Sequence, residues 1–154
     1  MSGRPNVAKP TPHLFVYGTL MKGFREEWQR KVRADFAGPG TIRASLYDLG
    51  DYPGARVLGA EPGQRVSGEL YRLRDPRLAL KILDKYEEFS PLEPNKSLFV
   101  RQLVSVTQED GRKKRAWAYL YNRRIANAKL IPTGHYRDTA NSRYSSLVVG
   151  GRAR

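Results

Sequence analysis

Two adjacent glutamates, Glu87 and Glu88, are the side chains best placed in this sequence to do acid–base chemistry. They close a segment, 75–88, that is predicted to be helical, with Leu80 and Leu83 on its apolar stripe. At 100° per residue, Glu87 lies only about 20° from Leu80, whereas Glu88 lies about 80° away. We therefore expect Glu87 to point toward the interior and Glu88 toward solvent.

The position of Glu87 favours the protonated form of its carboxyl group for two reasons. Partial burial removes hydration from the charged form, and the negative end of the helix dipole lies close by. A carboxylate held in this way is suited to act as a general base near neutral pH. Alternatively, Glu87 only ends the apolar stripe and pairs with a basic neighbour. Glu88 is expected on the polar face with Lys81 and Asp84.

A second feature is the tetrapeptide Tyr17-Gly18-Thr19-Leu20, which directly follows the apolar run Leu14–Tyr17. The run predicts a buried strand, and Gly18 allows the backbone to turn sharply at its end. Backbone N–H groups exposed in such a turn can bind a carboxylate or an oxyanion. The alternative is a tight turn without a ligand.

The composition excludes several kinds of site. The chain has no cysteine, so it can form neither disulfides nor thiolate zinc sites and has no cysteine nucleophile. Its two histidines, His13 and His135, leave little room for a histidine-built metal centre, and we predict no metal. No stretch is apolar and long enough to span a membrane, and no secretory leader is evident at the N-terminus. These features favour a cytoplasmic protein.

The chain is strongly basic, with 28 Lys and Arg against 15 Asp and Glu and a net charge of +13. Such an excess attracts anions, which include nucleic acid, membrane surfaces and small acidic substrates. The densest basic run, Arg112–Arg115, lies two residues before Trp117. A solvated basic surface without a ligand is the simplest interpretation of this charge.

A length of 154 residues predicts one domain. We expect a flexible leader over 1–12, a domain over 13–149 and a basic tail over 150–154. The predicted fold is α+β: a single compact domain with a small mixed β-barrel or sheet and one main helix. Predicted strands cover 14–17, 43–47, 66–73, 99–107 and 116–121, helices cover 23–33 and 75–88, turns cover 50–54 and 110–111, and 131–149 is turn-rich.

Several short motifs, taken in order, resemble the γ-glutamylcyclotransferase-like family, which is also called AIG2-like. Each motif is loose, but their order and spacing across roughly residues 13–136 are specific. They are Val16-Tyr17-Gly18-Thr19-Leu20, Tyr52-Pro53-Gly54, Val66-Ser67-Gly68-Glu69-Leu70-Tyr71, Leu83-Asp84-Lys85-Tyr86-Glu87, Phe99-Val100-Arg101 and Ala116-Trp117-Ala118-Tyr119-Leu120-Tyr121.

The resemblance implies a mixed β-barrel with a cavity at its mouth and an activity that needs no cofactor. Cyclising members of the family release 5-oxoproline and an amine or amino acid from a small γ-glutamyl substrate. The family's substrate loop falls on Tyr17, Gly18, Thr19 and Leu20, and its catalytic glutamate falls on Glu87. The resemblance thus selects the carboxylate that helical geometry places toward the interior.

This sequence departs from the family at Glu88, where many relatives have glycine; the extra side chain could narrow the pocket or change the substrate. Tyr52, Tyr119 and Tyr121 are candidates for lining the pocket, although each could equally pack in the core. Arg101 could bind an α-carboxylate, with a structural salt bridge as the alternative.

A second hypothesis is a binding module that keeps the fold without catalysis. The run Arg112–Arg115 beside Trp117 combines cations with an aromatic ring, as some nucleic-acid surfaces do, but no recognised nucleic-acid motif accompanies it. Salt-dependent binding of single-stranded nucleic acid would distinguish this hypothesis from the enzyme.

Overall fold

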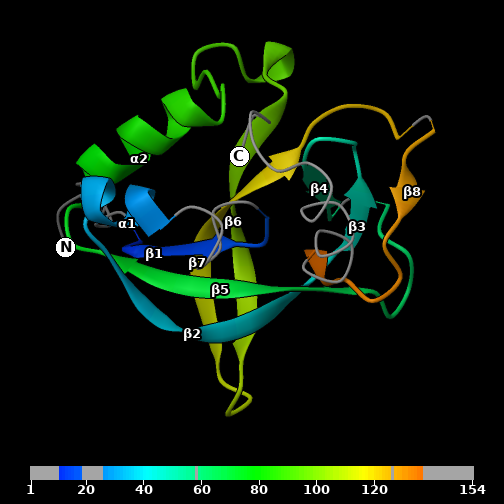
Figure 1. Cartoon of the computed structure of the whole chain (residues 1–154), viewed down its shortest axis with the longest axis horizontal. Helices are drawn as coiled ribbons and strands as arrows, with labels where there is room; N and C mark the ends of the chain where they lie inside the picture. Colours follow the sequence, from blue (N-terminus) through cyan, green and yellow to red (C-terminus); the bar gives the residue numbers. More distant parts are fainter. Residues whose placement is uncertain (1–10, 19–25, 58, 126, 137–154) are drawn as a thin grey trace, which may run out of the picture.

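The computed structural model describes residues 11–18, 26–57, 59–125 and 127–136, and its main feature is a closed five-stranded barrel (Figure 1). Neighbouring strands pair antiparallel except at the closure, where β1 runs parallel to β7 through the pair Leu14–Trp117. The predicted mixed barrel is therefore confirmed. In order around the barrel, the strands are β1 (His13–Val16), β5 (Arg65–Leu73), β2 (Ala34–Arg43), β6 (Phe99–Gln108) and β7 (Lys113–Tyr121).

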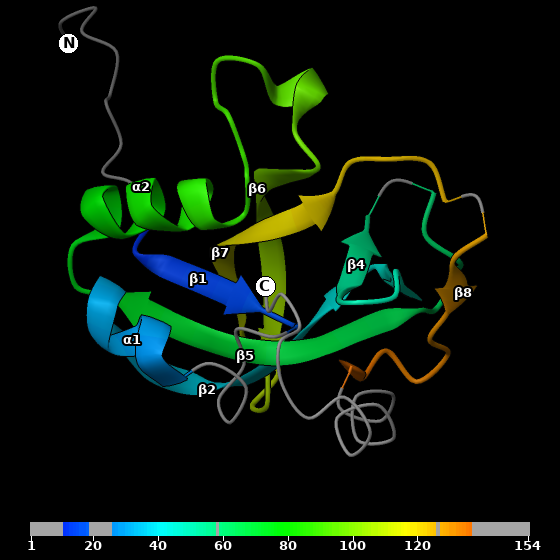
Figure 2. The ribbon, with the colours of Figure 1, turned by 45° about the horizontal axis from the view of Figure 1, so that its top comes forward.

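A smaller sheet and two helices complete the described fold, which is α+β as predicted. Helix α2 lies alongside β1 in both Figure 1 and Figure 2. The small sheet has the order β4-β3-β8 and stands beside the barrel. The bounds are α1 (Glu26–Val32), α2 (Pro76–Tyr86), β3 (Ser45–Asp48), β4 (Pro53–Arg56), β8 (Lys129–Leu130) and a 3-10 turn (Pro94–Lys96).

Helix α2 forms where its start signals predict. The Oδ1 atom of Asp75 accepts a hydrogen bond from the Leu78 N–H group at 3.3 Å, and Pro76 occupies the first helical position. Leu80 and Leu83 are buried, as expected for the apolar stripe. Burial of this stripe fixes the rotation of α2 about its axis and thereby the direction in which its last residues point.

Strand β2 was not predicted, because glycine and proline interrupt its middle. A β-bulge separates Phe36 from Gly38, and Gly40 pairs directly with Gly68 on β5. A Cβ atom on Gly40 would approach the Val106 side chain to 2.5 Å, and one on Gly68 would clash with the Val16 carbonyl oxygen. Glycine at these positions therefore allows close approach inside the barrel and does not end the strand.

Two other boundaries differ from the prediction. Strand β7 begins at Lys113, three residues before the predicted start, because the basic run pairs with β6 across the hairpin. Strand β4 begins at Pro53, inside the segment expected to be a turn, where it pairs with β3. Residues 1–10 of the predicted leader, residues 137–149 of the turn-rich segment and the predicted tail lie outside the described residues.

Candidate functional site

Glu87 is buried at the C-terminal end of α2, with 5% of its surface exposed. It caps the helix with φ −85° and ψ 3°, and its N–H group donates to the Leu83 carbonyl oxygen at 2.8 Å. The residue borders a small cavity of about 30 Å³ between the end of β1 and α2. The lining residues are Phe15, Val16, Tyr17, Gly18, Pro53, Glu87, Phe99 and Tyr119.

The neighbouring Glu88 is exposed, so the predicted separation of the two carboxylates is confirmed. Glu88 has φ +58°, the left-handed conformation that terminates many helices. The Glu88 N–H group donates to the Lys85 carbonyl oxygen at 3.2 Å, and the Phe89 N–H group donates to the Asp84 carbonyl oxygen at 2.8 Å. This is a Schellman motif, in which glycine is favoured at the position that Glu88 occupies.

Tyr17 connects the end of β1 to two neighbouring strands through its hydroxyl group. The hydroxyl donates to the Tyr119 carbonyl oxygen at 2.5 Å and accepts from the Ala55 N–H group at 3.1 Å. Burial raises the pKa of Tyr17, and the negative charge of Glu87 raises it further, although the bond from Ala55 opposes both. The phenol is therefore neutral at physiological pH, and its ring forms a fixed wall of the cavity.

Of the predicted substrate loop, only Tyr17 and Gly18 lie within the described residues, and both line the cavity with Glu87. Thr19 and Leu20 lie outside the described residues. The structure thus brings together two segments that are about 70 positions apart in the sequence, as the family resemblance implies.

Asp84 was expected on the polar face of α2, but it is buried, and that expectation is wrong. Its carboxylate accepts bonds from Arg101 Nε at 2.8 Å, Arg101 Nη2 at 3.2 Å and the Tyr119 hydroxyl at 2.6 Å. The polar partners come from β6 and β7, so no helical periodicity could indicate them. Burial and the bond to Asp84 raise the pKa of Tyr119, which keeps that phenol neutral.

Arg101 does not line the cavity. Its guanidinium group forms the two bonds to Asp84 and lies 4.5 Å from the ring centroid of Trp117, so it serves as the structural salt bridge given as the alternative. Tyr119 does line the cavity. Because its carbonyl and hydroxyl oxygens bond to Tyr17 and Asp84, it ties the end of β1 to α2.

Tyr52 and Tyr121 pack against Phe99, each with a centroid separation of 5.7 Å, and neither lines the cavity. Phe99 itself and Pro53 do line it, and they were not among the predicted site residues. Both lie within motifs that resemble the family, and this resemblance was the signal in the sequence that could have identified them as site residues. Next to Pro53, a Cβ atom on Gly54 would come within 2.8 Å of the Tyr121 Cβ atom, which explains the glycine.

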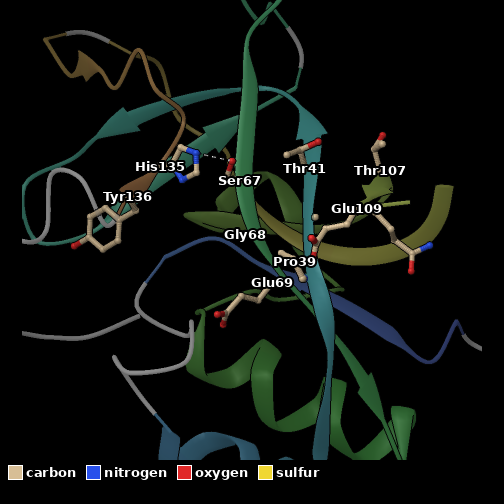
Figure 3. Close-up of a pocket in the computed structure, with 11 residues that line it drawn as sticks. Pro39, Thr41, Ser67, Gly68, Glu69, Thr107, Glu109, His135 and Tyr136 are labelled. Atoms are coloured by element: carbon tan, nitrogen blue, oxygen red, sulfur yellow. Dashed lines mark hydrogen bonds between the residues drawn. The ribbon is translucent and has the colours of Figure 1, made fainter. Parts of the chain in front are cut away.

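Two larger hollows lie elsewhere on the described surface. One, of about 340 Å³, is bordered by β2, β5 and the segment before residue 137; in it Ser67 Oγ and His135 Nε2 lie 3.1 Å apart (Figure 3). The other, of about 390 Å³, lies along β2 and β6. None of the predicted site residues that the structure describes lines either hollow.

The basic run Arg112–Arg115 is exposed at the tip of the β6–β7 hairpin and the start of β7. Arg112 lies 3.5 Å from Asp110 across this turn. The Trp117 ring is covered by Arg101, and its indole nitrogen is buried. The aromatic ring of the predicted basic–aromatic surface, that of Trp117, is therefore already in contact with an arginine of the protein itself.

Neither α1 nor α2 is long and apolar enough to cross a bilayer, nor is any other helix in the described part of the chain. Among the described residues, no three His, Asp or Glu side chains are grouped so that they could hold a metal ion.

Comparison with known proteins places this geometry in context. Residues 14–138 match the sequence profile described as "Gamma-glutamyl cyclotransferase, AIG2-like". The chain is 33% identical over 128 residues to the gamma-glutamylcyclotransferase family protein YtfP of Escherichia coli K12, covering 81% of this chain and 96% of that protein. It is 34% identical over 113 residues to the gamma-L-glutamyl-butirosin B gamma-glutamyl cyclotransferase of Niallia circulans, covering 73% and 68%.

Among solved structures, an AIG2-like protein from Mus musculus superposes with a TM-score of 0.57 at 25% identity. The match covers 74% of this chain and 80% of the mouse chain. The chain is therefore similar to these relatives in sequence, and to the mouse protein also in the arrangement of its elements.

Proposed function

The chain belongs to the gamma-glutamyl cyclotransferase, AIG2-like family, and we propose that it cyclises a γ-glutamyl compound with Glu87 as general acid and base. The products are 5-oxoproline and a free amine or amino acid. The observation that carries the proposal is the buried carboxylate of Glu87 in one cavity with Tyr17 and Gly18.

The reaction needs a base, because the nucleophile is the substrate's own α-amine. The nitrogen lone pair attacks the γ-carbonyl carbon, a new C–N bond closes the five-membered ring, and the bond to the leaving nitrogen breaks. Glu87 accepts the proton that the attacking nitrogen loses and returns it to the leaving nitrogen. Atoms and charge balance without an external oxidant, reductant or nucleophile.

We propose that the substrate loop Tyr17–Leu20 binds the γ-glutamyl group through its backbone N–H groups, which can also stabilise the oxyanion of the tetrahedral intermediate. The neutral phenol of Tyr17, bonded to Tyr119 and Ala55, supports this role by holding the end of β1 in place. The 30 Å³ bounded by described residues is about the volume of one water molecule. A γ-glutamyl group is larger than this volume, so the cavity bounded by the described residues does not by itself enclose the substrate.

The leaving group is less constrained than the γ-glutamyl half. The Niallia circulans relative is named for the γ-glutamyl compound gamma-L-glutamyl-butirosin B. We therefore propose that the substrate panel should contain γ-glutamyl amines as well as γ-glutamyl amino acids.

The experiment measures 5-oxoproline release from that panel with the wild-type chain, Glu87→Gln and Glu88→Gln. We expect Glu87→Gln to lower kcat by about 10²–10⁴-fold, the usual contribution of a general acid–base group. Glu88→Gln is the matched control, since it removes an adjacent but exposed carboxylate, and it should leave kcat nearly unchanged.

Two outcomes would contradict the proposal. Retained activity in Glu87→Gln would rule out Glu87 as the acid–base group. A folded wild-type protein that releases no 5-oxoproline from any member of the panel would rule out this substrate class.

A further inference from the structure

We propose that the 390 Å³ hollow along β2 and β6, separate from the Glu87 cavity, binds a phosphate group carried on a small aliphatic body. This hollow, called the basic groove below, is lined by Ile42, Arg43, Val57, Arg65, Gln102, Leu103, Val104, Ser105, Thr107 and Lys113. Among the described residues, it shares no lining residue with the cavity at Glu87.

The charge of the basic groove is uncompensated. Arg43 and Arg65 stand directly opposite each other in the β2–β5 register, and both are exposed. Like charges at opposed positions of a sheet destabilise it. Within the described part of the chain, neither arginine nor Lys113 forms an ion pair, and no lining residue is acidic. A bound anion would relieve this repulsion.

The donors of the basic groove match phosphate. Arginine offers two parallel N–H groups to a phosphate, and lysine adds a compact positive charge. One donor, Arg65 Nη1, contacts the hydroxyl of Thr41 at 3.2 Å, and Thr41 lines the neighbouring hollow of Figure 3. Two hydroxyl-bearing residues, Ser105 and Thr107, line the same groove from β6.

The apolar part of the lining indicates what carries the phosphate. Ile42 is buried, Leu103 and Val104 are half-buried, and Val57 is 43% exposed. None of the described lining residues is aromatic, whereas proteins that bind single strands stack bases on aromatic rings. The volume lies within the usual range of about 300–1,000 Å³ for small-molecule sites. An aliphatic phosphate ester satisfies both the cations and the apolar lining.

The hollow of Figure 3 does not have these properties. Its lining includes the carboxylates of Glu69 and Glu109, which would repel a phosphate, and among its described lining residues His135 is the only basic one. Of these two hollows, only the basic groove has no acidic residue among its described lining residues.

The test uses n-hexyl phosphate as probe, with inorganic phosphate for comparison, measured by calorimetry and by thermal unfolding of the full chain at low ionic strength. The variant Arg43→Gln/Arg65→Gln is compared with Arg77→Gln/Lys81→Gln, which removes two exposed charges from α2. We expect wild type and control to bind hexyl phosphate more tightly than inorganic phosphate. We expect the groove variant to lose at least tenfold in affinity for hexyl phosphate.

A second readout separates binding from folding. Without ligand, the groove variant should unfold at the same or a higher temperature than wild type, because the opposed charges are gone, and hexyl phosphate should no longer raise its Tm. Equal affinities in all three proteins would overturn the proposal. Tighter binding of a twelve-nucleotide single strand than of hexyl phosphate, lost in the groove variant, would reassign the groove to nucleic acid.

The outcome is independent of the proposed cyclotransferase reaction. The groove variant leaves Glu87, Tyr17 and their neighbours unchanged, so its 5-oxoproline release should equal that of wild type.

Discussion

Two arginine–aspartate pairs in this protein have almost the same geometry but lie in different surroundings. Arg101 binds Asp84 with Nε–Oδ1 at 2.8 Å and Nη2–Oδ2 at 3.2 Å, and Arg74 binds Asp35 with two contacts of 2.9 Å. The side chains of the first pair are 18% and 12% exposed, and those of the second are 64% and 51% exposed. The contacts between arginine and aspartate are therefore alike in the two pairs, and the pairs differ in burial.

Because the two pairs differ in burial, we expect them to contribute differently to stability despite their similar hydrogen-bond geometry. In the exposed pair, Arg74 lowers the pKa of Asp35, yet water and salt screen the interaction. In the buried pair, each charge depends on its partner, because neither can regain its hydration. The buried pair also lies beside Tyr119, which lines the cavity of Glu87. The ion pair that contacts a residue of the candidate site is thus the one that is largely removed from water.

The largest expected effect is that of Asp84→Asn. This change leaves the Arg101 guanidinium buried without its counter-charge, which typically costs about 3–5 kcal/mol of unfolding free energy. Urea denaturation at constant pH measures it. The same change at the exposed pair, Asp35→Asn, is the matched control and should leave the urea midpoint nearly unchanged. Equal losses in the two variants would contradict the role assigned to burial.

A double substitution sharpens this comparison. In Asp84→Asn/Arg101→Met, the unpaired charge is gone, so the loss should be smaller than in Asp84→Asn alone. If the double variant is less stable than the single one, the loss reflects packing and not the uncompensated charge.

The second expected effect is that of Arg101→Lys, which keeps the charge but removes the paired N–H groups and the planar contact with Trp117. We expect a loss of about 1–2 kcal/mol by urea denaturation. Arg74→Lys at the exposed pair should cause no measurable change. If neither Arg101→Lys nor Arg74→Lys lowers the unfolding free energy, a positive charge near Asp84 is sufficient and the paired N–H groups of Arg101 are not needed.

The third effect concerns the exposed carboxylate next to Glu87. Glu88→Gly should raise the unfolding free energy by about 0.5–1 kcal/mol, because φ +58° is strained for glutamate and free for glycine. Glu88→Ala removes the same charge but keeps the strain, so it should not stabilise the protein. Thermal unfolding of both variants separates the backbone effect from the charge effect.

The smallest effect is a pH dependence at His13. Burial lowers the pKa of His13, and the positive charges of Lys114 and Arg72 lower it further. Just below the ordinary pKa of histidine, the unfolded chain therefore binds a proton that the folded chain does not, and stability falls as the pH decreases. Between pH 7 and 5.5, His13→Gln should lose less stability than wild type, by at most about 0.5 kcal/mol because the ring is partly solvated. Parallel stability–pH curves for the two proteins would contradict this.

Local signals in the sequence were sufficient for the elements that carry them. The Asp75–Pro76 start and the apolar spacing of Leu80 and Leu83 predicted α2, and helical geometry then separated Glu87 from Glu88. These features depend on contacts within a few residues, which is why a single sequence can reveal them. Strand β2 was missed because its glycines and proline resemble a loop locally, although they allow close packing against Val106.

The sequence by itself therefore determined the helix, most of the strands and the direction of one carboxylate. Only the tertiary structure decided the rest: the burial of Asp84, its bonds to Arg101 and Tyr119, and the meeting of Arg43 and Arg65 on neighbouring strands. Each of these contacts joins residues from different elements. The bonds of Asp84 reach Arg101 and Tyr119, which lie 17 and 35 positions further along the chain. Helical periodicity reports which face of α2 is apolar, but a polar side chain becomes buried only where another element supplies its partner.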